Sequence, residues 1–342
     1  MRAFLQGESK RGYDGTIGRL IDIYLSHEDS PYNGMKATSR RVYYTYAVRL
    51  KQAYGELLVR DTTGLDVKRW HKDWRAPAKP GGPELLGAAA MSKAVLLSSL
   101  SFGVVCGHVE CSVLQASIKN LKLPGPKARD MAPTAEEIEL ARKAAHAIGR
   151  HSAALCYALQ FETVIRQWDL IGQWLELSDK HPSAIIRKGM KWVGPTWADL
   201  GDNLVLTITP TKTEGTTGKK VIVDLSLCPM VMEELALIPA EQRVGPLVAN
   251  ERDGMPYQAR RFSDVWGDVR KKAGLPPDLW NRDLRAGGNT EAEMAGASAD
   301  DRAKAAGHSK KTNTRVYSRD VLVSTSRVAE ARAAFRAKKN TT

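Results

Sequence analysis

The sequence is poor in cysteine. Its 342 residues include four, Cys106, Cys111, Cys156 and Cys228. Four cysteines are too few for a disulfide framework in a chain of this length, so the composition favours a reducing compartment. Cys106, His108 and Cys111 form a C-x-H-x-x-C pattern, but the neighbouring sequence offers no fourth ligand and no second cluster. This argues against a structural zinc site.

Long apolar runs free of charge are also missing. The longest apolar stretch, LLGAAAMSKAVLLSSLSFGVVCG at 85–107, contains Lys93 and several serines. We interpret it as a buried helix rather than a membrane span. The first residues do not resemble a signal peptide. We therefore expect a cytoplasmic protein.

Acidic residues are outnumbered by basic ones. The chain has 51 Lys and Arg against 38 Asp and Glu, a net charge of +13 and a pI of about 9.5. Residues 1–130 hold 20 basic and 12 acidic residues, and residues 131–342 hold 31 and 26. Such an excess indicates a polyanionic partner, nucleic acid before membrane, although charge alone is equally consistent with simple solubility. An excess in both halves suits a clamp around a duplex better than one basic tail would.

The first part of the chain is predicted to be helical. Residues 1–11 are polar, and we expect a flexible N-terminus there, followed by a helical domain over 12–122. TIGRLIDIYLS at 16–26 predicts an amphipathic helix, and TTGLDVKRWHKDWRA at 62–76 a short capped one. The buried face of the first helix is predicted to consist of Ile17, Leu20, Ile21 and Tyr24.

A second helix is predicted over KATSRRVYYTYAVRLKQAYG at 36–55, with Thr38 or Ser39 as its N-cap and Gly55 at its end. Val42, Tyr46 and Leu50 would form its apolar face. The cations that lie off that face, and that we expect to bind DNA phosphates, are Arg40, Arg41 and Lys51.

A boundary follows at LPGPKARDMAP, 123–133, whose three prolines and one glycine predict a linker. Thr134 and Glu137 then fit a capping box that opens a second domain, 134–342. Helices are expected to about residue 175, and LVLTITPTKTEGTTGKKVIVDLSL at 204–227 predicts a β-hairpin. The fold class is therefore mainly α with a small β-sheet or hairpin, in two domains.

Polar residues set against apolar neighbours recur in the second domain. FETVIRQWDLIGQ places Arg166 at the end of an apolar run, with Asp169 one helical turn later. The hairpin places Lys212 where its first strand meets the turn. WNRDLRAGGNT supplies Arg282 and Arg285, three apart and on one helical face.

The last of these segments is GHSKKTNTRVYSRD, 307–320. Tyr317 stands nine positions after His308 in a polar, basic stretch, with only Val316 as an apolar neighbour. Singly, each of these residues has an ordinary explanation, such as a surface ion pair, a solvated turn lysine or a helix cap.

Together and in this order, the segments resemble the tyrosine recombinase (phage integrase) family. That family carries an arginine in R-x-x-E/D, a lysine on a β-hairpin, H-x-L-R, G-H-S and a late tyrosine. The matching residues are Arg166, Asp169, Lys212, Arg282, Arg285, His308 and Tyr317. The likeness is strong over 160–320 and looser over the rest of 12–335.

The resemblance implies a site-specific DNA recombinase that cleaves and rejoins DNA through a 3′-phosphotyrosyl intermediate. Tyr317 would be the nucleophile, Arg166 and Arg285 would grip the non-bridging phosphate oxygens, and Lys212 would protonate the 5′-oxygen. His308 would bond the phosphate or assist proton transfer. Asp169 would orient the cluster of arginines and histidine, and Arg282 would donate a hydrogen bond to a phosphate oxygen.

The resemblance also implies an architecture and partners. A helical core-binding (SAM-like) domain over 12–122 would join a mixed α+β catalytic domain over 134–342. The partners would be double-stranded DNA and further copies of the chain, as a tetramer at synapsis and a weak oligomer or monomer when free. The segment 321–339 has apolar residues at helical spacing, which pack on their own domain or, as in the family, dock on a neighbouring protomer. No cofactor, metal or membrane is expected, and the setting would be the bacterial or phage nucleoid.

Two departures bear on this interpretation. Arg282 stands where the family has a histidine, and arginine can donate to phosphate but cannot act as a base. We interpret it as a tolerated variant rather than a sign of an inactive site. Lys219 and Lys220 compete with Lys212 for the lysine role. The alternative functions are a type IB topoisomerase-like enzyme and a catalytically inactive, integrase-derived DNA-binding protein.

Overall fold

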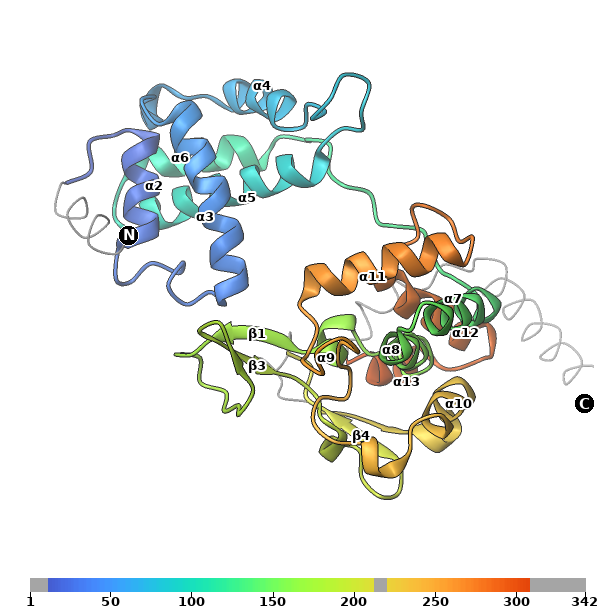
Figure 1. Ribbon diagram of the computed structural model, residues 1–342. Coiled ribbons are helices and arrows are strands. Elements are labelled where there is room, and N and C mark those ends of the chain that lie inside the picture. The colour runs from blue at the N-terminus through green and yellow to red at the C-terminus, as the bar shows by residue number, and fades with distance from the viewer. Residues whose placement is uncertain (1–11, 212–219, 308–342) are drawn as a thin grey trace, which may run out of the picture. The chain divides into compact units, whose positions relative to one another are not determined.

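The computed structural model describes residues 12–211 and 220–307 (Figure 1). The chain divides into two compact units, Met1–Ala128 and Arg129–Thr342, each with its own hydrophobic core. The division falls within 123–133, a stretch without helix or strand. Below, the two parts are called unit 1 and unit 2. The described part is mainly helical with small antiparallel sheets, as the sequence predicts.

Unit 1 is built from helices that surround one core. Their bounds are α2 Ile17–Ser26, α3 Ala37–Tyr54, α4 Gly64–Trp74, α5 Leu86–Val105 and α6 Val109–Lys119. The predicted buried face of α2 is confirmed, because Ile17, Leu20, Ile21 and Tyr24 are fully buried. Thr16 caps α2 by accepting from the Arg19 backbone N–H at 3.1 Å.

The start and the buried face of α3 differ from the sequence prediction. The N-cap is Lys36 and makes no side-chain cap bond, so Thr38 and Ser39 lie inside the first turn. Val42 is 42% exposed, while Ala47 and Leu50 are buried. The first turn of α3 therefore extends beyond the core, and the helix is buried only in its second half. Its predicted end at Gly55 is confirmed.

The apolar helix α5 lies in the core of unit 1. Among the described residues it is the one helix whose length and composition would suffice to cross a membrane. It contacts α2, α3, α4 and α6, and its buried residues include Val95, Leu96 and Leu100. Packing inside unit 1 buries these residues, whereas Val105 at the end of the helix is 80% exposed.

Unit 2 is centred on α8, which is buried along nearly its whole length and contacts α7, α10 and α12. Thr134 and Glu137 form the predicted capping box at the start of α7. The described helices of this unit are α7 Ala135–Ala147, α8 His151–Glu162, α9 Gln167–Ile171, α10 Pro229–Ala236, α11 Ala259–Lys272, α12 Leu284–Met294 and α13 Ala299–Ala305.

Two antiparallel sheets complete the described part of unit 2. One has the order β1-β3-β2, with β1 Gln173–Glu176, β2 Ile186–Arg187 and β3 Met190–Val193. The other is the predicted hairpin, β4 Val205–Ile208 paired with β5 Val221–Asp224. The expectation of helix to residue 175 is wrong, because Gly172 ends α9 with a φ of +71°. A Cβ there would lie 2.3 Å from Nε1 of Trp192, so only glycine permits β3 to pack this closely.

Candidate active site

Asp169 connects two segments of the predicted site. It lies in α9, and its side chain is 1% exposed. Its Oδ1 accepts from the backbone N–H of Thr211 at 2.9 Å and from the Thr211 hydroxyl at 2.8 Å. Its Oδ2 lies 3.5 Å from Nη1 of Arg166. The carboxylate therefore ties the arginine to the end of the hairpin's first strand.

Arg166 stands at the N-cap of α9, at the end of a sharp turn out of α8. Two residues earlier, Val164 has a φ of +48°, a conformation that β-branched residues rarely adopt. The Arg166 side chain is 18% exposed, so its guanidinium remains accessible while it faces Asp169.

The hairpin continues from Thr211 into residues 212–219, which lie outside the described part. Lys212 and Lys219 are among them. Lys220 is exposed and directly precedes β5. The register pairs Ile208 with Val221, so both ends of the turn are fixed by the ladder.

Arg285 lies in the first turn of α12 and is 5% exposed. Its Nη2 donates to the carbonyl oxygen of Ala306, just after α13. Gly307 follows with a φ of +58°, and a Cβ there would lie 3.3 Å from Cγ of Pro210 and 3.4 Å from Cγ2 of Val221. The end of α13 therefore packs on the hairpin. His308 and Tyr317 lie outside the described residues.

The two arginines of the R-x-x-R pattern differ in their surroundings. Arg282 belongs to a 3₁₀ turn, Asn281–Asp283, and is exposed, whereas Arg285 is buried in the helix that follows. The Arg282 guanidinium lies 4.2 Å from the ring centroid of Trp280. The sequence analysis did not identify Trp280 as part of the site. Its position two residues before Arg282 was the one signal that could have indicated this contact.

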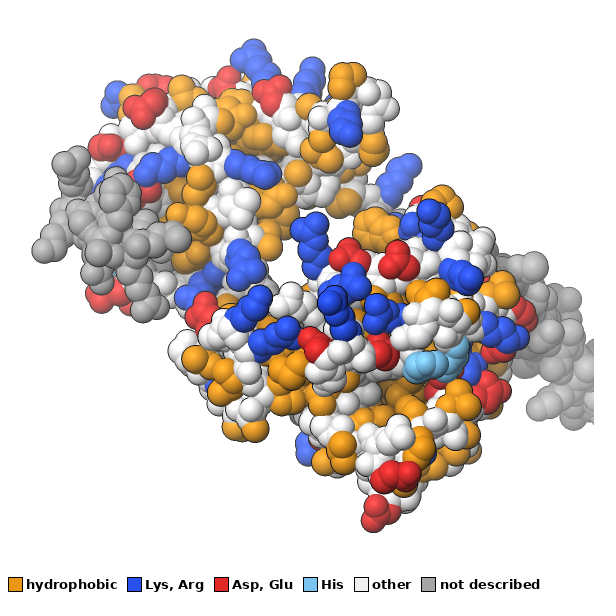
Figure 2. Space-filling model, in the orientation of Figure 1, with side chains coloured by type: hydrophobic (Ala, Val, Ile, Leu, Met, Phe, Trp, Pro, Cys, Tyr) orange, Lys and Arg blue, Asp and Glu red, His pale blue; other side chains and the backbone are white. Residues whose placement is uncertain are grey.

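The described residues thus bring four segments together: the start of α9, the end of β4, the start of α12 and the end of α13. Arg166 and Arg285 each come from one of them, and the residues just before Lys212 and His308 come from the others. Figure 2 shows Lys and Arg side chains gathering, with a few Asp and Glu among them, on the face that carries α9 and α11. A guanidinium can bind an anionic phosphodiester through two parallel N–H···O bonds.

The cations predicted to bind DNA in unit 1 have different surroundings. Arg41 is exposed and Arg40 is half-buried near the start of α3. Lys51 forms an ion pair with Asp22, in which Nζ lies 2.7 Å from both carboxylate oxygens. Part of the Lys51 charge is therefore already compensated within the unit.

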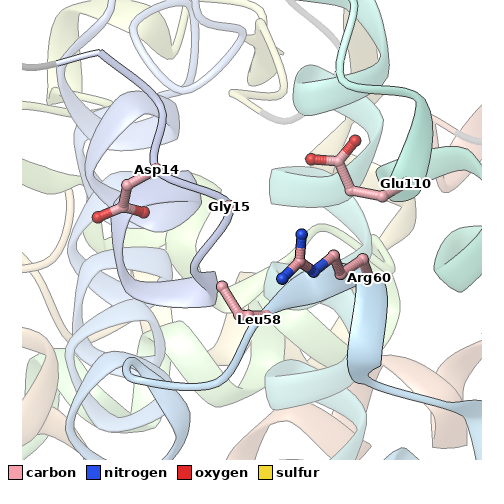
Figure 3. A pocket seen from close by; sticks show the side chains of 5 residues that line it. All are labelled: Asp14, Gly15, Leu58, Arg60 and Glu110. Carbon is pink, nitrogen blue, oxygen red and sulfur yellow. The ribbon is translucent and has the colours of Figure 1, made fainter.

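A pocket of about 280 Å³ in unit 1 contains none of the predicted residues. Figure 3 shows Arg60 reaching into the space between Leu58 and Glu110, with Asp14 and Gly15 on the other side. Its lining mixes both signs of charge. Over the described residues, no group of three or more His, Cys, Asp and Glu side chains could hold a metal ion.

Comparison with solved structures finds the same fold in integrases bound to DNA. A lambda integrase dimer bound to a COC′ core site has a TM-score of 0.63 at 16% identity, covering 95% of this chain and 80% of that one. A lambda integrase tetramer bound to a Holliday junction has a TM-score of 0.63 at 16% identity, covering 94% and 80%. The Tn1549 transposon integrase in complex with transposon right end DNA has a TM-score of 0.64 at 14% identity, covering 93% and 99%.

These identities establish a likeness of fold, which the chain shares with the integrases of those structures. The predicted fold class is confirmed in this respect. No family model matches the sequence. No curated protein matches it either.

Proposed function

We propose that this chain is a site-specific DNA recombinase that cleaves and rejoins DNA through a 3′-phosphotyrosyl intermediate. The observation that carries the proposal is the pair of side-chain connections that join its predicted segments. Asp169 connects the Arg166 segment to Thr211, next to Lys212, and Arg285 connects α12 to Ala306, two residues before His308. The fold shared with DNA-bound integrases supports the same conclusion.

In the proposed reaction, the hydroxyl oxygen of Tyr317 attacks the scissile phosphorus and forms a new P–O bond. The bond to the 5′-oxygen breaks, and that oxygen takes a proton from Lys212. The phenol proton passes to His308 or to water. Charge that builds on the non-bridging oxygens is stabilised by Arg166 and Arg285, because preorganised cations stabilise a transition state without reorganisation. The reverse attack by a 5′-hydroxyl rejoins a strand and frees the tyrosine.

Energy is conserved because one phosphate ester replaces another, so the reaction calls for neither ATP nor another cofactor. Asp169 acts through Arg166 and the hairpin rather than on the phosphate itself. Its burial favours this role, since a carboxylate exposed to the DNA backbone would repel it.

The proposal extends to organisation and setting. Unit 1 would grip the duplex through Arg40, Arg41 and Lys51, and unit 2 would hold the scissile phosphate. Synapsis of two sites would bring four copies together, with residues 321–339 docking in trans. Such a protein would work in the nucleoid of a bacterium or of a phage-infected cell.

The test begins by selecting duplexes that bind the Tyr317→Phe variant from a random DNA library. The selected sequences are then made as suicide substrates, nicked close to each candidate cleavage position. We expect a covalent protein–DNA adduct on a denaturing gel with the native chain and none with Tyr317→Phe. Selective binding without an adduct at any nick position would instead favour the inactive DNA-binding protein. Relaxation of plasmids that lack the selected sequence would favour the topoisomerase.

A further inference from the structure

Trp280 is a half-exposed aromatic residue in a firmly anchored loop. It is 46% exposed, although its neighbours Leu279 and Asn281 are buried at 1% and 4%. Nε1 of Trp266 donates to the Leu279 carbonyl at 2.9 Å, and Nε2 of Gln160 donates to the Asn281 carbonyl at 2.8 Å. The backbone is therefore fixed on both sides of the indole, and its exposure does not come from a loose loop.

Two guanidiniums lie over the Trp280 ring. The Cζ of Arg129 is 4.1 Å from the ring centroid, and the Cζ of Arg282 is 4.2 Å from it. Both distances fall well inside the range of cation–π attraction. The indole thus contacts one arginine from the start of unit 2 and one from the R-x-x-R pattern.

The two arginines differ in charge compensation. Arg129 forms a bidentate ion pair with Asp283, in which Nε lies 3.0 Å from Oδ1 and Nη2 lies 2.6 Å from Oδ2. Asp283 also accepts from the backbone N–H of Trp280 at 2.9 Å. In the part of the chain that the structure describes, no carboxylate pairs with Arg282. Within those residues, its charge is not compensated and can bind an external anion.

We propose that Trp280 is a positioning residue that holds the Arg282 guanidinium for one backbone phosphate of bound DNA. A guanidinium that stacks by its face keeps its N–H donors at the edge, where a phosphate can accept two of them. Arg129 and Asp283 fix the loop and the indole. The inference rests on the proposed function.

The test measures binding of the full chain to a mixed-sequence DNA duplex as a function of salt. Each phosphate neutralised contributes about 0.9 to the slope of log Kobs against log salt, so Arg282→Ala should lower that slope by about this amount. Trp280→Leu should weaken DNA binding about as much as Arg282→Ala does, because the guanidinium of Arg282 no longer stacks on an aromatic ring. Trp280→Phe, which keeps an aromatic face, should restore most of the affinity.

Coupling between the two residues is measured by the double variant Trp280→Leu/Arg282→Ala. We expect it to bind little worse than Arg282→Ala alone, since the indole acts through the arginine. The control is Arg252→Ala, because Arg252 is an exposed arginine in a separate loop. The fold-losses of DNA affinity caused by Arg252→Ala and by Trp280→Leu should multiply in the double variant. Arg282→Lys keeps the charge but not the flat face, and it should also weaken binding.

Multiplicative effects of Trp280→Leu and Arg282→Ala would overturn the inference, as would native affinity in a folded Trp280→Leu or Arg282→Lys variant. Thermal unfolding of each variant establishes that it is folded. If Trp280→Leu does not fold, Trp280→Phe and Arg282→Lys still decide the result. Loss of all salt-dependent DNA binding in the native chain would contradict the proposed function itself, whereas unchanged binding in the variants contradicts only the role of Trp280.

Discussion

At the scale of single residues, Asp169 connects two of the predicted site segments. One carboxylate oxygen accepts two bonds from Thr211, and the other faces Arg166. Hydrogen bonds to a buried charged group contribute about 1.5–3 kcal/mol, more than neutral ones. The position of the arginine is thus coupled to the end of the hairpin strand.

We predict that Asp169→Asn separates folding from catalysis. The amide oxygen can still accept from Thr211, but the amide nitrogen would then face the Arg166 guanidinium, donor against donor. Arg166 should lose its fixed position, and cleavage of a suicide substrate should fall on the order of 10²-fold. The free energy of unfolding should drop by only about 1–3 kcal/mol. Adduct yield over time and urea unfolding measure the two effects.

The chain offers a matched control in Asp199. Its Oδ2 accepts from the backbone N–H of Thr196 at 2.7 Å and from the Thr196 hydroxyl at 2.9 Å, the same pattern as Asp169 with Thr211. No arginine pairs with Asp199 within the described ranges 12–211 and 220–307. Asp199→Asn should therefore leave cleavage unchanged. Equal cleavage rates in the two variants would show that Asp169 does not act through Arg166.

At the scale of elements, the docking of α12 on α8 places Arg285. The glycines of RAGGNT make this docking possible. A Cβ on Gly287 would lie 2.1 Å from the Pro133 carbonyl oxygen, and one on Gly288 would lie 1.9 Å from the Phe161 carbonyl oxygen. Backbone atoms cannot move aside as a side chain can, so any larger residue would push the helix away.

We predict that Gly288→Ala destabilises the protein by at least about 1–3 kcal/mol, the usual cost of overpacking. Gly267→Ala is the control, since Gly267 also lies inside a helix, α11, but a Cβ there meets nothing within 4 Å. That change should stabilise by about 0.5–1 kcal/mol, because alanine loses less backbone entropy on folding. Urea unfolding of both variants compares them. Stabilisation of both by the same amount would show that helix propensity, and not the contact with Phe161, decides the result.

Periodic and local signals in the sequence predict much of this architecture. The apolar face of α2, the Thr134 capping box and the β4–β5 hairpin depend on neighbouring residues, and all three are present. The β1-β3-β2 sheet is different. Its strands are short, β2 has two residues, and pairing of Gln173 with Val193 becomes visible only once the fold exists.

The same distinction holds for the site. The order and spacing of Arg166, Asp169 and Arg285 are written in the sequence, because each lies in a recognisable short pattern. The connection of Asp169 to Thr211 and the stacking of Trp280 on Arg129 join residues far apart in the chain. No local pattern encodes such contacts, since they depend on how the helices pack.

At the scale of the whole molecule, the chain consists of two units with separate cores. One core is built on α2, α3 and α5, and the other on α8 with the elements around it. Each half of the sequence carries an excess of basic residues. Two linked modules that bind the same duplex gain affinity from the high effective concentration of the second once the first is bound.

We predict that the full chain binds a mixed-sequence duplex about 10²–10⁴-fold more tightly than the better of its two separated units at equal salt. The separated pieces are residues 1–128 and 129–342, and circular dichroism shows whether each retains its helices. The salt slopes of the two pieces should add up to that of the full chain, because each unit neutralises its own phosphates. If either piece alone binds as tightly as the full chain, with the same slope, the other unit contributes no phosphate contacts and the clamp is excluded.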